Sequence, residues 1–254
     1  MMQPAQALQP DDLPLPGQSA RVAFFGGSFD PPHQGHLAVA RAARAAFALD
    51  LVLFAPVGMQ PLKPEGPTAS FKDRLAMTHL AIAGEAGFEV SLADAPRPAA
   101  GGGARPNYTM ETLENLRATL APGARLFCLM GADSFFGLSQ WRRAAEIPFL
   151  ASLIVASRPG QPLEGLKEAL PAGLALEPAP EASGFRAGAE VRAFTLVNQA
   201  GNRTPFYVLP SLDVAVSASE IRAALQAAPA SVLGGLGLVP AAVREYMAER
   251  GLYR

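Results

Sequence analysis

One stretch decides the fold that we expect for this chain: Gly26-Gly27-Ser28-Phe29-Asp30-Pro31-Pro32-His33-Gln34-Gly35-His36-Leu37. It follows an apolar run over residues 21–25, which is typical of a buried strand, and leads into an alanine-rich run over residues 37–47, which is typical of a helix. In α/β proteins, a strand that ends in a glycine turn before a helix start is a place where phosphate binds, because free N–H groups point at the anion.

Two of the three histidines of the chain, His33 and His36, lie in this stretch. An imidazole can donate a hydrogen bond to a phosphate oxygen, while Gly26 and Gly27 let the backbone approach a bulky anion closely. A pair of metal ligands is the competing interpretation, but no carboxylates or cysteines accompany the histidines at ligand spacing. A tight turn with two surface histidines is the other alternative. The full stretch favours a phosphate site, and we predict no metal held by the protein itself.

A second motif lies near the other end of the chain, Val216-Ser217-Ala218-Ser219-Glu220-Ile221-Arg222. Ser217 and Glu220 have the spacing of a capping box, so we expect a helix to begin here. The hydroxyls of Ser217 and Ser219 and the guanidinium of Arg222 would then offer donors and a cation to an anion. Taken alone, the motif rather indicates an ordinary capped helix with a solvated arginine.

Composition narrows the class of protein. The chain has 254 residues, half of them apolar, which is enough to bury a full core. Its formal net charge of −1 argues against a nucleic-acid binder that neutralises many backbone phosphates. A small anionic ligand needs only a few local cations and stays allowed. The single cysteine, Cys128, excludes an internal disulfide and a multi-cysteine zinc site.

The apolar pattern predicts alternating strands and helices. Strands are expected over residues 22–25, 51–55, 88–92, 126–130, 152–156 and 206–209. Helical patterns cover residues 38–48, 71–83 and 109–120, and a last helix is expected between Pro240 and Gly251. Such alternation predicts an α/β fold with a parallel sheet that helices cover on both faces, in one domain over residues 21–254.

Three segments depart from this alternation. Residues 96–106 contain Gly101-Gly102-Gly103 and are expected to form a mobile loop without regular structure. Residues 161–203 lack firm periodicity, so we expect a short helix near 163–170 and then an irregular excursion. Residues 1–20 have several prolines but no apolar core of a signal peptide, which indicates a flexible tail. No run reaches the length of a membrane span, so a soluble, cytoplasmic protein is expected.

Together, the two motifs resemble the His-x-Gly-His and Ile-Ser-x-Thr/Ser-x-Ile-Arg signatures of the nucleotidyltransferase superfamily. More narrowly, the chain resembles the bacterial nicotinate-nucleotide adenylyltransferases. The resemblance runs in order over residues 21–254 and includes Gln60-Pro61-Leu62-Lys63, Arg74 with Met77, Tyr108-Thr109-Met110-Glu111-Thr112-Leu113, Gly131-Ala132-Asp133 with Trp141, Arg158-Pro159-Gly160 and Val239-Pro240 with Tyr246. It implies a doubly wound, Rossmann-like sheet, in agreement with the strand pattern.

The resemblance also implies an ATP site built from both motifs. His33 and His36 would contact the phosphate chain and, with Arg222, form the catalytic set. The remaining residues implied to bind ATP come from the two motifs and from the stretch after the fourth predicted strand: Gly26, Gly27, Ser28, Gly131, Asp133, Ser217, Ser219 and Ile221. From the residues alone, Asp133 could instead cap the next short helix.

For the acceptor nucleotide, the resemblance implies a site formed by Lys63, Tyr108, Thr109, Trp141 and Arg158. Trp141 would stack on the pyridine ring, and N–H groups near Thr109 and Trp141 would take the ring carboxylate. Lys63 would serve the mononucleotide phosphate or the developing charge, although Leu62 stands where the family often has histidine. The alternatives are a core tryptophan, a solvated lysine and a plain helix cap at Tyr108-Thr109.

The implied reaction joins ATP and nicotinate mononucleotide into nicotinate adenine dinucleotide and pyrophosphate, a step of NAD biosynthesis. Mg²⁺ would be carried by the ATP phosphates. All of this requires that residues 26–37 and 216–222 form opposite walls of one pocket. Rival interpretations are the same chemistry on nicotinamide mononucleotide or phosphopantetheine, and a nucleotide-binding module without activity. The sequence leaves a homo-oligomer open.

Overall fold

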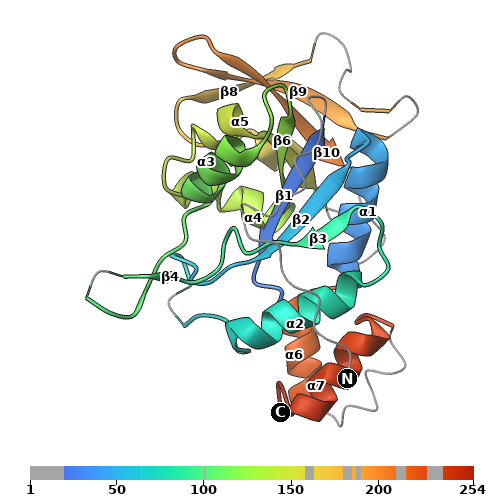
Figure 1. Ribbon diagram of the computed structural model, residues 1–254. Helices are drawn as coiled ribbons and strands as arrows, with labels where there is room; N and C mark the ends of the chain where they lie inside the picture. The colour runs from blue at the N-terminus through green and yellow to red at the C-terminus, as the bar shows by residue number, and fades with distance from the viewer. Residues whose placement is uncertain are drawn as a thin grey trace.

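The computed structural model describes residues 20–63, 65–99, 101–157, 163–179, 185–186, 190–209, 216–227 and 237–254, with the side chains of residues 163 and 164 left aside. Its centre is an eight-stranded sheet with the order β3-β2-β1-β6-β7-β10-β9-β8 (Figure 1). The strands are β1 (Arg21–Gly27), β2 (Leu51–Pro56), β3 (Phe88–Val90), β6 (Arg125–Gly131), β7 (Ser152–Ala156), β8 (Leu174–Pro178), β9 (Arg192–Asn198) and β10 (Arg203–Leu209).

Helices cover both faces of this sheet. They are α1 (Gln34–Phe47), α2 (Phe71–Ile82), α3 (Thr109–Thr119), α4 (Ala132–Phe136), α5 (Ile147–Leu150), α6 (Ala218–Ala227) and α7 (Ala241–Arg250), with 3₁₀ turns η2 (Leu138–Gln140) and η3 (Leu163–Leu166). Successive residues of β1 alternate between two core clusters, as the pleat requires: Val22 and Phe24 belong to one, Ala23 and Phe25 to the other. The first cluster contains residues of α3, α4 and α5, and the second contains residues of α1, α2, α6 and α7.

The predicted parallel sheet with both faces covered is therefore confirmed for its centre. Six strands pair in parallel with one another, in the order β3, β2, β1, β6, β7 and β10. From β1 the chain builds outward to β2 and β3, and then returns to β6 on the other side of β1. The carboxyl ends of β1 and β6 thus flank a topological switch point, the place where open α/β sheets bind ligands.

The expected irregular excursion over residues 161–203 is wrong in its main part. The short helix is present as η3, but β8 and β9 then extend the sheet, each antiparallel to its neighbour. Both strands have mostly half-buried or exposed residues. Because an edge hairpin of this kind buries little of either face, it leaves a weak alternation in the sequence.

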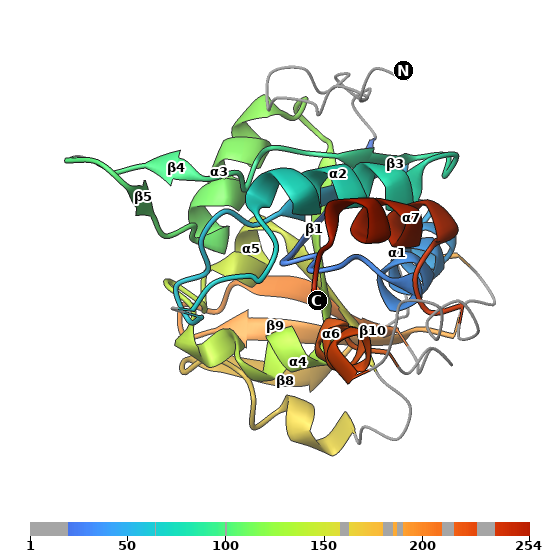
Figure 2. The same cartoon turned by 90° about the horizontal axis from the view of Figure 1, so that it is seen from below.

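The expectation of irregular structure over residues 96–106 is also wrong. Strands β4 (Arg97–Pro98) and β5 (Ala104–Arg105) pair as an antiparallel hairpin that projects from the body of the molecule (Figure 2). At its tip, Gly101, Gly102 and Gly103 have φ values of 100°, 99° and 82°. These values are strained for any residue with a Cβ, so the glycine run makes the reversal instead of preventing regular pairing.

A close approach of backbone fixes the segment after β2. A Cβ added at Gly58 would lie 2.5 Å from both N and Cα of Pro96, and 2.8 Å from Oδ1 of Asn107. We predict that Gly58→Ala lowers the free energy of unfolding by about 1–3 kcal/mol, because the backbone must move apart. Urea unfolding measures this. The control is Gly137→Ala, whose Cβ would make only ordinary contacts of 3.7 and 3.8 Å. Equal midpoints for Gly58→Ala and the unmodified protein would contradict the prediction.

Among the residues that the structure describes, no helix combines the length and the apolar composition that a bilayer span requires.

Candidate active site

The turn between β1 and α1 places two imidazole rings side by side. His33 is the N-cap of α1, and its main-chain N–H donates to Nδ1 of His36 at 3.2 Å. The two ring centroids are 3.7 Å apart. Because Nδ1 of His36 accepts this bond, the neutral ring carries its proton on Nε2 and can donate it to a ligand. His33 is buried and His36 half-buried.

The space around residue 35, between the two histidines, favours glycine. A Cβ at Gly35 would lie 3.0 Å from Nδ1 and Cε1 of the His33 ring and 3.1 Å from Cγ1 of Val216. Real Cβ contacts are seldom this short, so a side chain at residue 35 would displace the His33 ring and the Val216 side chain. The start of the second motif thus packs directly against the first.

The capping box predicted at the start of α6 is confirmed. The N–H and the hydroxyl of Ser217 both donate to Oε2 of Glu220 at 2.8 Å, and the N–H of Glu220 donates back to Oγ of Ser217 at 3.2 Å. Ile221, which the resemblance implies for the ATP site, has its side chain turned into the core. Its side chain is buried in the second core cluster and its N–H donates to Ser217 O, so it anchors α6 from within.

Arg222 joins the two motifs. Its Nη1 donates to the main-chain oxygen of Asp30 at 2.7 Å and lies 3.7 Å from the carboxylate oxygen Oδ2 of the same residue. Its Nη2 donates to Oγ of Ser219 at 3.3 Å. Residues 26–37 and 216–222, although far apart in the chain, therefore meet at one place. This contact is what a shared pocket would require, and the pocket itself stays a prediction.

Arg74 supports the turn from beneath and is structural. It is 1% exposed, and its guanidinium donates to three main-chain oxygens: Ser28 at 2.7 Å, Val57 at 2.8 Å and Ala69 at 3.3 Å. Burial lowers the pKa of Arg74, and the Asp30 charge opposes this. A guanidinium remains charged in either case. Arg74 thus holds the turn between β1 and α1 to the segment after β2.

The loop after β2 brings Lys63 toward the same turn. Oγ of Ser28 donates to Oε1 of Gln60 at 3.1 Å, and the N–H of Lys63 donates to the main-chain oxygen of Gln60 at 3.3 Å. Lys63 itself is exposed, and Leu62 beside it is 51% exposed. The loop that carries Lys63 is thus tied to the β1–α1 turn through Gln60.

The residues expected to hold adenosine lie where β6 ends, next to β1. A Cβ at Gly131 would meet nothing within 4 Å, so the space beside it is open. Asp133 is exposed in the first turn of α4. Gly26 and Gly27 end the neighbouring strand β1. Gly131 and Asp133, like Gly26 and Gly27, thus lie at the switch point between β1 and β6. Arg158 lies outside the described residues.

Tyr108 and Trp141, expected on the acceptor side, come from neighbouring segments. Tyr108 is the N-cap of α3, Thr109 is its first residue, and both are half-buried. The guanidinium carbon of Arg142 lies 4.8 Å from the centre of the Tyr108 ring. Trp141 is half-buried and packs against the first core cluster. The main-chain N–H of Trp141 donates to Leu138 O. The ring carboxylate of the acceptor would therefore have to be bound by other N–H groups nearby.

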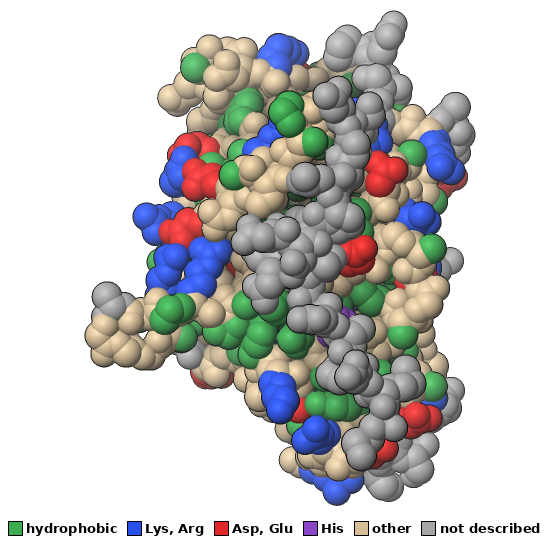
Figure 3. All heavy atoms as spheres, in the orientation of Figure 1, with side chains coloured by type: hydrophobic (Ala, Val, Ile, Leu, Met, Phe, Trp, Pro, Cys, Tyr) green, Lys and Arg blue, Asp and Glu red, His purple; other side chains and the backbone are tan. Residues whose placement is uncertain are grey.

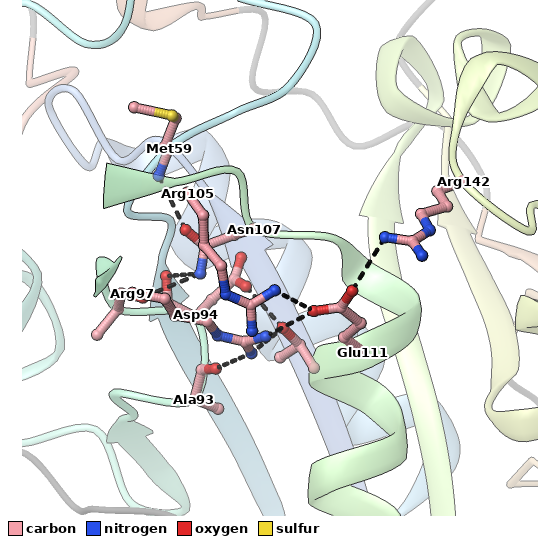
Figure 4. A network of polar contacts seen from close by, with 10 residues as sticks. Met59, Ala93, Asp94, Arg97, Arg105, Asn107, Glu111 and Arg142 are labelled. Atoms are coloured by element: carbon pink, nitrogen blue, oxygen red, sulfur yellow. Dashed lines mark hydrogen bonds and ion pairs between the residues drawn. The ribbon is translucent and has the colours of Figure 1, made fainter. Parts of the chain in front are cut away.

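A charge cluster next to Tyr108 was not expected from the sequence. Glu111 accepts hydrogen bonds from Arg97 at 3.1 Å and Arg105 at 2.9 Å on Oε2, and from Arg142 at 3.2 Å on Oε1 (Figure 4). In Figure 3, basic and acidic side chains gather over α3 beside the hairpin. Glu111 thereby ties the base of the β4–β5 hairpin to the segment of Trp141. No local pattern indicates this, because the arginines are 6 to 31 residues away.

Comparisons with known proteins identify the family of this chain. A family model described as cytidylyltransferase-like matches residues 24–224. A probable nicotinate-nucleotide adenylyltransferase of Chromobacterium violaceum is 39% identical over 237 residues, which cover 93% of this chain and 100% of the relative. The chain belongs to the nicotinate-nucleotide adenylyltransferase family.

Other members of this nicotinate-nucleotide adenylyltransferase family match as well. A probable enzyme of that name from Geobacter sp. is 35% identical over 236 residues, covering 92% of this chain and 98% of the relative. A solved structure of Plasmodium falciparum nicotinic acid mononucleotide adenylyltransferase complexed with NaAD superposes with a TM-score of 0.63. It is 14% identical and covers 92% of this chain and 97% of its own. This likeness confirms the expected Rossmann-like fold.

Proposed function

We propose that this protein transfers the adenylyl group of ATP to nicotinate mononucleotide and releases pyrophosphate, which makes it an enzyme of NAD biosynthesis. The observation that carries the proposal is the meeting of the two motifs, with Nη1 of Arg222 at 2.7 Å from the main-chain oxygen of Asp30. The names of full-length relatives support the choice of acceptor.

In the proposed reaction, a phosphate oxygen of the mononucleotide attacks the α-phosphorus of ATP in line. A new O–P bond forms, the bond from the α-phosphorus to the bridging oxygen breaks, and the electron pair leaves with pyrophosphate. The attacking phosphate is already ionised at neutral pH, so no general base is needed. The rate then comes from positioning and from charge stabilisation. We assign this work to His33, His36 and Arg222.

Mg²⁺ would neutralise phosphate charge when it is bound. The part of the chain that the structure describes contains no group of three or more His, Cys, Asp or Glu side chains that could hold a metal ion. We therefore propose that the cation enters on the oxygens of the ATP phosphates, which suit its preference for oxygen ligands. The homo-oligomer and the cytoplasmic location considered from the sequence stay predictions.

On the acceptor side, we propose that Trp141 stacks on the pyridine ring and that Lys63 serves the mononucleotide phosphate. Tyr108 and Thr109 would line the site of the ring at the N-terminus of α3. The N–H groups of the first turn have no partner within the helix and could donate to the ring carboxylate. The half-buried state of Trp141 supports this role, because a ring face can be offered to a ligand while the other packs on the core.

The proposed function is tested by turnover with ATP and each acceptor, following pyrophosphate release. We expect the highest kcat/KM with nicotinate mononucleotide. A higher value with nicotinamide mononucleotide or with phosphopantetheine would reassign the acceptor. Nucleotide binding without turnover of any of the three would instead support a binding module.

Trp141→Ala should raise KM for nicotinate mononucleotide about tenfold, since base–aromatic stacking contributes roughly 1–3 kcal/mol. We expect KM for ATP to change little, because ATP is assigned to the other motifs. Initial rates at varied concentrations of each substrate measure both constants. Trp141→Phe is the control and should keep most of the affinity. A rise in KM for ATP alone would show that the ring has been assigned to the wrong subsite.

A further inference from the structure

Asp30 is a buried carboxylate at the centre of the β1–α1 turn. It is 3% exposed, and its oxygens accept three hydrogen bonds: from the N–H of Thr68 at 2.7 Å, the N–H of Ala69 at 3.0 Å and the hydroxyl of Tyr253 at 2.7 Å. A buried charge requires such partners. Asp30 also contacts Arg222 through both its main-chain oxygen and its carboxylate.

Tyr253 reaches this carboxylate from the end of the chain. It is 5% exposed in the second core cluster, two residues after Gly251, which ends α7. Its φ of 62° lies in the left-handed region, which is costly for a residue with a bulky side chain. Burial and the neighbouring Asp30 raise the pKa of the hydroxyl. The group therefore remains a donor at neutral pH.

We propose that Tyr253 is a positioning residue, which holds the Asp30 carboxylate so that Arg222 stays directed at the phosphate chain. This inference rests on the proposed function of the site. Oδ1 of Asp30 receives the Tyr253 hydroxyl, while Arg222 lies 3.7 Å from Oδ2, too far for a hydrogen bond. The carboxylate is thus satisfied by neutral donors, and the cation is left available for a ligand.

Removal of the hydroxyl would change this balance. In Tyr253→Phe, Oδ1 keeps only the Ala69 N–H, so the negative charge of Asp30 attracts the nearby guanidinium more strongly. Arg222 would then close the 3.7 Å gap and withdraw from the phosphates. Since hydrogen bonds to charged groups are among the stronger ones in proteins, we expect a loss of about tenfold in both kcat and the affinity for inorganic pyrophosphate.

The chain offers a matched control. The hydroxyl of Tyr246 donates to Oδ1 of Asp73 at 2.9 Å and so joins α7 to α2. It is also a tyrosine–aspartate bond of the C-terminal segment, but neither residue is assigned to the site. Tyr246→Phe should lose some stability and leave pyrophosphate binding unchanged. A general loosening of the C-terminal segment would instead weaken binding in both variants.

The experiment measures binding of inorganic pyrophosphate by calorimetry, together with kcat and KM, in the full chain. Tyr253→Phe should weaken pyrophosphate binding about tenfold and leave KM for the mononucleotide unchanged. In an Arg222→Ala background, the same substitution should have no further effect on binding, because its effect passes through Arg222. Equal losses in the Tyr253 and Tyr246 variants, or a full effect in the Arg222→Ala background, would overturn the proposal. Because pyrophosphate binding needs no acceptor, this result is separable from a failure of the proposed reaction.

Discussion

Replacement of His36 by alanine is expected to lower kcat by about a hundredfold or more while the fold survives. One donor aimed at developing charge in a transition state commonly contributes this much. The structure gives a reason for choosing His36, because its Nδ1 accepts the N–H of His33 and the neutral ring therefore carries its proton on Nε2, the atom that we assign to the phosphate chain. Steady-state kinetics measures kcat, and circular dichroism checks the fold.

The control for this substitution is His79→Ala. His79 lies in α2 and is the third histidine of the chain, half-buried, with its pKa lowered by burial. It is not assigned to the site, so kcat should stay near that of the unmodified protein. If His36→Ala turned over at a normal rate, the imidazole would have no part in the reaction.

Replacement of Arg222 by alanine is the second large expected effect, a loss of about a hundredfold in kcat. The guanidinium is a cation fixed at the start of α6, where we propose that charge develops on the leaving pyrophosphate. Arg222→Lys should lose less than alanine but not recover full activity. Lysine keeps the charge but cannot reproduce the fork that joins Asp30 and Ser219.

Arg143→Ala serves as the matched control for a lost arginine. Arg143 is exposed and pairs with Glu114 and Glu146, away from the two motifs. Surface pairs of this kind contribute little, so neither kcat nor pyrophosphate affinity should change much. Full activity of Arg222→Ala would remove the second motif from the proposed chemistry.

Local sequence patterns predicted the parallel core well. The buried strands around β1 are apolar runs, and α6 begins at the serine that its capping-box spacing indicated. The same reasoning was wrong for β8 and β9, whose residues are mostly half-buried or exposed. It was also wrong for the β4–β5 hairpin, because a run of glycines is compatible with a tight reversal as well as with a loop.

The supporting residues of the site could not be predicted. The partners of Arg74 are main-chain oxygens of three separate segments. Asp30 and Tyr253 are 223 residues apart, and Glu111 collects arginines from the hairpin and from the Trp141 segment. Partners at such separations leave no periodicity or spacing that a single sequence can reveal.

The sequence by itself determined the strand, turn and helix start around the two histidines, the capped start of α6 and the parallel centre of the sheet. Each of these depends on neighbours within a few residues, where backbone geometry fixes which groups meet. Only the tertiary structure decided that Arg222 lies against Asp30 and that Tyr253 reaches the carboxylate of the same residue. These contacts form because burial of the apolar face of α6 and α7 carries their polar residues to the edge where β1 ends.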